Sequence, residues 1–112
     1  MTDLPCAEIN ATEGLQISYP GESLYRSGAA FPTREGLTCL NALAGWLKTS
    51  PGTQLLFTVS GEEGHEFDAL ALAAKRQELL QRYFKRQGIN VDGWQWTTEK
   101  AAAVQLQITA VN

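Results

Sequence analysis

One arginine occupies a position where the surrounding pattern predicts an apolar side chain. The segment from about Glu66 to Gln87 has the periodicity of a long amphipathic helix, and Arg76 falls about 40° from Leu72 on its helical wheel, inside the apolar stripe. An unpaired buried guanidinium is costly, so Arg76 needs an anion or a carbonyl partner. Two roles remain open. One is structural, either as an ion pair or as an arginine that snorkels to a sheet edge, and the other is a binding site for a ligand carboxylate, which suits the five donors of arginine.

Acidic residues gather where this helix is expected to begin. The four are Glu62, Glu63, Glu66 and Asp68. Negative charges at this end complement the helix dipole, which gives the cluster a structural interpretation. A pair of carboxylates for glycoside hydrolysis would need a defined separation and a cleft, and the sequence specifies neither.

No pattern in the chain predicts catalysis, a metal site or a cofactor. His65 is the only histidine, and no nucleophile elbow, Cys-His signature or phosphate-binding loop accompanies it. Cys6 and Cys39 cannot form a zinc site by themselves, and His65 lies far from both in the sequence. We therefore expect a protein that is not an enzyme and that has no metal and no cofactor.

The two cysteines leave their redox state open. Cys39 falls on the flank of the first expected helix, and Cys6 lies in the segment that precedes the first strand. A disulfide would pin that segment to the helix in an oxidising compartment, whereas two isolated buried thiols would suit a reducing one.

Further basic and aromatic residues suggest surfaces rather than active sites. The basic ones on the second helix are Lys75, Arg82, Lys85 and Arg86. They fit a solvated helix face, and the net charge of −3 with no interleaved aromatic residues argues against nucleic-acid binding. Trp94 and Trp96 share one face of a short strand, where they either cover the core or stack on a sugar or partner.

Length and composition predict one globular domain. The chain has 112 residues, of which 44% are hydrophobic and 19% charged. No apolar run approaches the roughly 20 residues of a membrane-spanning helix. The first six residues lack the pattern of a signal peptide. They fit a cytosolic start, or a start codon added to a mature exported domain.

Hydrophobic periodicity predicts six elements after a lead-in segment at 1–14, within a domain at 15–112. Strands are expected at 15–19, 54–60, 94–97 and 104–110, and helices at about 34–49 and 66–87. Thr33 is expected to cap the first helix, and Gly88 to end the second in a left-handed conformation. The first helix is expected to bury Leu37, Leu40, Leu43, Ala44 and Leu47. The resulting class is α+β, with a βαβαββ order and two helices on one face of a mixed four-stranded sheet.

This order and spacing resemble the OmpA-like domain, the peptidoglycan-associated module of bacterial envelopes found in peptidoglycan-associated lipoprotein and the MotB C-terminal region. The likeness covers about residues 15–110. The family signature runs TDxxG, NxxLSxxRA and YLxxxGI. The positions in register with it, without gaps, are Gly64, Leu72, Arg76, Leu80, Tyr83, Phe84, Gly88 and Ile89.

The same resemblance implies a degenerate ligand site. In the family, the aspartate of TD and the arginine of RA hold the diaminopimelate of the peptidoglycan stem peptide. Arg76 takes the arginine position, but Gly61 takes that of the aspartate, and Ala69 and Ala73 replace the asparagine and serine. The arginines of the family's NRRV are lost in the segment 101–104.

Two functions follow as expectations. The chain is an envelope module that binds the stem peptide weakly or not at all, with Arg76 as cation and Glu62, Glu63 or Asp68 as a shifted anion. Alternatively, it is a protein-interaction or structural module of an envelope assembly that has lost peptidoglycan binding. The resemblance also implies a periplasmic or envelope location without membrane insertion by this chain, and it favours a bridge between Cys6 and Cys39.

Overall fold

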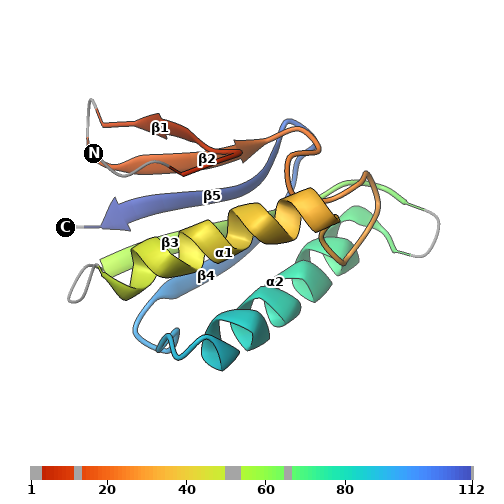
Figure 1. Ribbon diagram of the computed structural model, residues 1–112. Coiled ribbons are helices and arrows are strands. Elements are labelled where there is room, and N and C mark those ends of the chain that lie inside the picture. The colour runs from red at the N-terminus through yellow and green to blue at the C-terminus, as the bar shows by residue number, and fades with distance from the viewer. Residues whose placement is uncertain (1–3, 12–13, 50–53, 65–66, 112) are drawn as a thin grey trace.

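Two helices cover one face of a five-stranded sheet in the computed structural model of the chain (Figure 1). The structure describes residues 4–11, 14–49, 54–64 and 67–111. The helices are α1 (Arg34–Lys48) and α2 (Ala69–Arg86). Neither is long and apolar enough, within the described residues, to cross a membrane. The expected α+β class, with both helices on one face of a mixed sheet, is confirmed.

The order of the strands places the end of one strand beside the start of α2. The strands are β1 (Glu8–Asn10), β2 (Gln16–Pro20), β3 (Gln54–Gly61), β4 (Gln95–Lys100) and β5 (Val104–Val111), arranged as β1-β2-β5-β3-β4. β3 pairs with β4 in parallel and with β5 in antiparallel orientation. Parallel neighbours need a long crossover, which α2 provides here. The chain therefore passes from the end of β3 through a single loop into α2.

The fifth strand corrects the predicted count of four. β1 lies within the expected lead-in segment and pairs antiparallel with β2, so that Ile9 faces Ile17. It has only three residues, too few for an alternating pattern to be recognised in the sequence. A disulfide between Cys6 and Cys39 also ties this segment to α1. The sequence left open either a disulfide or two free thiols, and the structure contains the disulfide.

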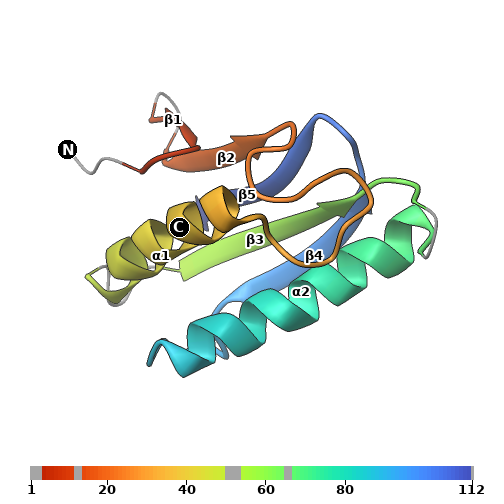
Figure 2. The ribbon, with the colours of Figure 1, turned by 45° about the vertical axis from the view of Figure 1, so that its right-hand side comes forward.

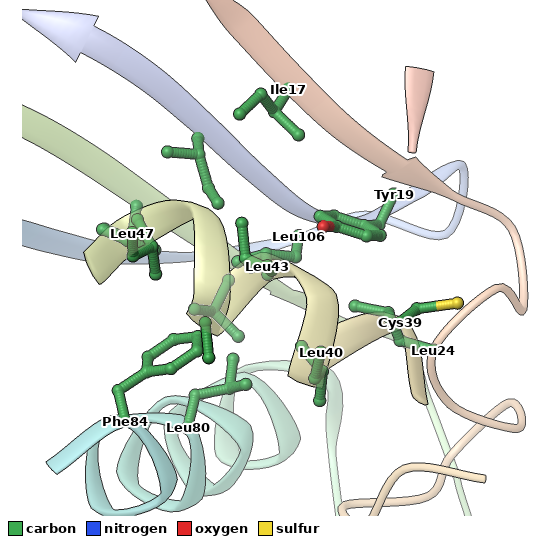
Figure 3. Packing of buried hydrophobic residues seen from close by; sticks show 14 of the residues in the cluster. Ile17, Tyr19, Leu24, Cys39, Leu40, Leu43, Leu47, Leu80, Phe84 and Leu106 are labelled. Carbon is green, nitrogen blue, oxygen red and sulfur yellow. The ribbon is translucent and has the colours of Figure 1, made fainter. Parts of the chain in front are cut away.

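The first helix buries a narrower stripe than its pattern predicted. The Thr33 hydroxyl caps it, accepting a hydrogen bond from the Gly36 N–H at 2.9 Å, as expected. The predicted residues Leu40, Leu43, Ala44 and Leu47 are buried, and Figure 3 shows Leu40, Leu43 and Leu47 within the apolar core. The prediction for Leu37 was wrong, because its side chain is 41% exposed. Leu37 lies at the edge of the stripe and borders a groove toward α2.

The second helix begins at Ala69, later than predicted. Its N-cap is Asp68, whose side chain accepts a hydrogen bond from the Ala71 N–H at 2.8 Å. Residue 66, where the helix was expected to begin, lies outside the described residues. After the helix ends, Gly88 has a φ of +85°, so the expected left-handed residue is confirmed.

A bulge turns one polar side chain of β5 inward. Tyr19 pairs with Leu106 and Pro20 with Val104, which leaves Gln105 as an extra residue. Gln105 is buried, and its Oε1 accepts hydrogen bonds from the backbone N–H groups of Leu24 and Tyr25 at 3.0 Å each. The side chain thereby fixes the loop from β2 to α1, which carries part of the site described next.

Candidate functional site

Arg76 is fully buried at the point where three parts of the chain meet. It belongs to α2, and its side chain is 0% exposed. The loop between β2 and α1, drawn in orange in Figure 2, reaches across the sheet toward the first half of α2. The end of β3 approaches the same place from the other side. Arg76 therefore lies between one loop, one strand end and the loop that follows that strand.

Every N–H group of the guanidinium has an acceptor. Nε donates to the Ala29 carbonyl at 2.8 Å, and Nη1 donates to the Ser60 carbonyl at 2.9 Å. Nη1 and Nη2 donate to the two carboxylate oxygens of Glu62 at 3.1 and 2.8 Å. Nη2 also donates to the Arg26 carbonyl at 3.4 Å. Because arginine has five N–H donors, none remains for an outside ligand in this arrangement.

Glu62 supplies the negative charge that this buried arginine requires. Its side chain is 13% exposed and forms a two-pronged ion pair with Arg76. Its Oε1 also accepts the backbone N–H of Gly28 at 2.9 Å. Burial raises the pKa of the Glu62 carboxyl, but the hydrogen bonds from Arg76 and Gly28 and the charge of Arg76 together outweigh it. The net pKa of Glu62 is therefore lowered.

An aromatic ring and two glycines complete the enclosure. The guanidinium carbon of Arg76 lies 4.4 Å from the centre of the Tyr25 ring, at a distance for a cation–π contact. Gly28 has a φ of +80°, and a Cβ there would lie 3.2 Å from the Cα of Gly64. The two loops approach so closely at Gly28 and Gly64 because neither carries a side chain.

Gly61 shows equally close packing at the end of β3. A Cβ on Gly61 would lie 2.0 Å from the carbonyl oxygen of Ala69 and 2.7 Å from the Ala73 nitrogen. Real side chains do not make such contacts, so α2 rests directly on the strand at this position. No side chain fits at residue 61 unless the helix moves away.

The other acidic candidates do not meet Arg76. Asp68 caps α2, and Glu63 is exposed and pairs with Lys100 at 3.7 Å. Residues 65 and 66, which include the candidate His65 and Glu66, lie outside the described residues. Among the described residues, no group of three histidine, cysteine, aspartate or glutamate side chains could hold a metal ion.

The remaining candidates line the surface or cover the core. On α2, Lys75 and Arg82 pair with Glu78 at 3.0 and 3.7 Å. The Trp96 ring stacks on Phe57 with the ring centres 4.2 Å apart, and the Trp94 ring lies 5.1 Å from Phe57. Both tryptophans therefore cover the apolar core. On the surface, Lys85 lies 3.8 Å from Asp92.

A hollow adjoins the enclosed arginine. It has a volume of about 670 Å³ and lies between the loop from β2 to α1 and the loop that follows β3. Arg26 and Lys75 line it together with Glu63, so charges of both signs face the same space.

Several groups around Arg76 could not be identified from the sequence. The carbonyls of Arg26, Ala29 and Ser60 and the N–H of Gly28 are backbone groups, which any residue type provides. The one available signal was the charge of Arg76 within an apolar stripe, which required an anion and a set of acceptors. It did not distinguish Glu62 from its acidic neighbours.

Comparison with known proteins identifies the fold. No protein-family model matches the sequence, and no curated protein is similar to it in sequence. Among solved structures, the periplasmic domain of Helicobacter pylori MotB matches with a TM-score of 0.76 and 10% identity over 98% of this chain and 82% of that one. The cell wall anchor of the T6SS from Pseudomonas aeruginosa gives 0.72 and 12%, over 94% and 87% of the two chains.

A third match carries the family name that the sequence pattern implied. The OmpA-like domain of FopA1 from Francisella tularensis gives a TM-score of 0.58 and 16% identity, over 96% of this chain and 82% of that one. The fold of this chain is therefore OmpA-like, as its residue pattern predicted.

Replacing the buried arginine should unfold much of this arrangement. We expect Arg76→Ala to lower the free energy of unfolding by about 3–5 kcal/mol, because it leaves the Glu62 carboxylate buried without its partner. Arg82→Ala is the matched control, since this arginine is on the same helix but 59% exposed, and it should cost about 0.5 kcal/mol or less. Urea denaturation at neutral pH measures both, and equal losses would contradict a buried ion pair.

Acid should weaken the ion pair in a defined direction. Because folding lowers the pKa of Glu62, its stabilising effect is complete above the ordinary carboxyl pKa of 4.5 and is lost as pH falls through the folded-state value. Wild type should therefore lose its stability advantage over Glu62→Gln as the pH is lowered. Denaturation of both chains between about pH 7 and pH 3 measures this. A difference that stays constant across the range would show that Glu62 does not titrate in this way.

A side chain at position 61 should not be tolerated. We expect Gly61→Asp to destabilise the fold by about 3 kcal/mol or more, because its Cβ would overlap the Ala69 carbonyl. Gly45→Ala is the control: that glycine is within α1 with no atom near the added Cβ, so alanine should stabilise by about 0.5–1 kcal/mol. Thermal unfolding compares the two, and a Gly61→Asp chain as stable as wild type would refute the close packing.

Proposed function

We propose that this chain is a non-enzymatic module of a bacterial cell envelope whose own Glu62 occupies the place of a ligand carboxylate. The OmpA-like fold supports the scaffold, and the solved structures similar to this chain include a periplasmic domain and a cell wall anchor. An envelope location of this chain also agrees with its disulfide, since such bonds persist in oxidising compartments. No part of the proposal requires chemistry by the chain itself.

The complete set of acceptors around Arg76 carries this proposal. A ligand carboxylate would need at least two N–H donors in the geometry that Glu62 already uses. To bind, it would have to displace Glu62 from Arg76 and from Gly28, and it would leave the Glu62 carboxylate without these partners. That exchange breaks at least as many charge-assisted hydrogen bonds as it makes, so it provides no net gain for an outside carboxylate.

The position corresponding to the family aspartate supports the same conclusion. The resemblance assigns that aspartate to Gly61, where the backbone of α2 leaves no room for a side chain. Ala69 and Ala73, at the positions of the family asparagine and serine, are buried against the strand. A zwitterionic ligand thus finds neither its anionic partner nor the flanking polar groups.

Arg76 then has a structural role in this module. It joins the loop from β2 to α1 with the end of β3 through backbone carbonyls on both sides. A loop and a strand end that are held together in this way suit a structural or protein-interaction function within an envelope assembly, rather than binding of the stem peptide.

Weak stem-peptide binding at the neighbouring hollow is the second candidate. Lys75 and Glu63 both line that hollow and could meet the two charges of a diaminopimelate residue. Both side chains already have partners, Glu78 at 3.0 Å and Lys100 at 3.7 Å, so any such binding competes with exposed ion pairs.

Co-sedimentation with purified diaminopimelate-type sacculi tests the proposal. We expect the wild-type chain to remain in the supernatant, because no N–H donor of the Arg76 guanidinium is available to a stem-peptide carboxylate. The cell wall anchor from Pseudomonas aeruginosa serves as the positive control. Glu62→Ala, checked for folding by circular dichroism, reports whether binding is restored when the Glu62 carboxylate is removed from Arg76.

Each outcome separates the candidates. Absence of wild-type binding supports the proposal, and binding gained by Glu62→Ala would strengthen it. Wild-type binding that Lys75→Ala abolishes would favour the hollow instead. Wild-type binding that survives Lys75→Ala would contradict both.

A further inference from the structure

An apolar groove that neither Arg76 nor Glu62 lines runs between the two helices. It has a volume of about 320 Å³ and is bordered by the loop before α1, the first half of α1 and the second half of α2. Phe31 and Leu37 line it, with exposed fractions of 69% and 41%. Leu79 and Tyr83 form the α2 wall, and the Tyr83 hydroxyl donates a hydrogen bond to the Asn41 side chain on α1. That bond connects the two walls.

Basic side chains border this apolar surface. Arg86 lines the groove, and Arg34 precedes Leu37 by three residues and therefore shares its side of α1. Within the described part of the chain, no carboxylate lies within ion-pair distance of Arg34 or Arg86. Both arginines are exposed, so they are accessible to an outside anion.

The charge distribution of the whole chain favours the same face. Seven of the nine basic residues lie in α1 and α2, whereas ten of the twelve acidic residues lie outside these helices. Arg76 is buried and paired with Glu62, and the remaining six basic residues still outnumber the two acidic residues of the helices, so a chain with a net charge of −3 has a positive helical layer. Such a layer attracts a negative partner and repels a positive one.

We infer that the groove binds an acidic peptide segment of a partner protein, with one aromatic or aliphatic side chain inserted beside Phe31 and Leu37. Carboxylates that flank the inserted residue pair with Arg34 and Arg86. An apolar anchor with charged neighbours matches the organisation of protein–protein hot spots. This surface is separate from the ion pair of Arg76 and Glu62, so the inference does not depend on whether that pair excludes a ligand.

The shape of the surface favours a peptide over a lipid bilayer or a second copy of the chain. A membrane-binding helix buries a continuous apolar face along its length, whereas here the apolar residues form a confined hollow between two walls. A second copy would bring its own positive helical layer against this one in any symmetric pairing, which costs repulsion.

Selection from a random twelve-residue peptide library tests the inference. The library is first depleted on the double variant Phe31→Ala, Arg86→Glu and then selected on the wild-type chain. We expect enriched peptides to place aspartate or glutamate on both sides of a leucine, phenylalanine or tryptophan. Absence of enrichment on wild type over the double variant, or enrichment of neutral or basic peptides, would overturn the inference.

Single variants then locate the binding. By fluorescence anisotropy, an enriched peptide should bind Phe31→Ala about fivefold and Arg86→Glu about tenfold more weakly than wild type. The controls Leu70→Ala and Lys85→Glu change residues that are 58% and 59% exposed but do not line the groove, and should bind within about twofold of wild type. Equal losses in variants and controls would refute the site.

Two further measurements exclude the other occupants. Phosphatidylglycerol vesicles should not bind the chain in a way that depends on Phe31, and sedimentation equilibrium should show no dimer that Phe31→Ala weakens. Vesicle binding that depends on Phe31 would assign the groove to a membrane, and a dimer that Phe31→Ala weakens would assign it to a second copy. Either observation would overturn the peptide inference.

Discussion

A buried positive charge must be fully partnered, and this requirement at Arg76 organises the functional end of the molecule. The guanidinium draws the Glu62 carboxylate, the end of β3 and the loop before α1 into one set of hydrogen bonds. The glycines at 28 and 64 allow the loops to close over it, and Gln105 holds the same loop from the other side. Without the Glu62 partner, the cost of burying Arg76 would oppose all of these contacts.

Under the proposed function, this arrangement lets an OmpA-like scaffold persist without the ligand that the family resemblance implies. In the family pattern, an arginine at this position meets a carboxylate that arrives with the ligand. Here the chain carries its own carboxylate one residue after Gly61, which makes the arginine part of the fold. The Tyr25 ring contacts Arg76 and also borders the groove between the helices, so the enclosed arginine supports the wall of an unrelated surface.

The sequence predicted most of the fold because the core follows simple periods. The helices, four of the strands, the Thr33 cap and the left-handed Gly88 all follow from hydrophobic spacing and local backbone chemistry. β1 was missed because three exposed residues carry no period, and Leu37 because a helical wheel does not specify where a neighbouring helix leaves a gap. Arg76 was recognisable from its charge, whereas its partners were not, since most are backbone groups and Glu62 is one of several nearby acids.

The account depends on whether Arg76 is occupied by Glu62 in solution. NMR of the Arg76 side chain measures this directly, with the Nε–H and Nη–H signals followed while a diaminopimelate-containing stem peptide is added. We expect slowly exchanging signals that do not move with the peptide and that change in Glu62→Gln. Signals that exchange rapidly, or that shift in proportion to the added peptide, would show that the arginine is open to the ligand and would contradict the central claim.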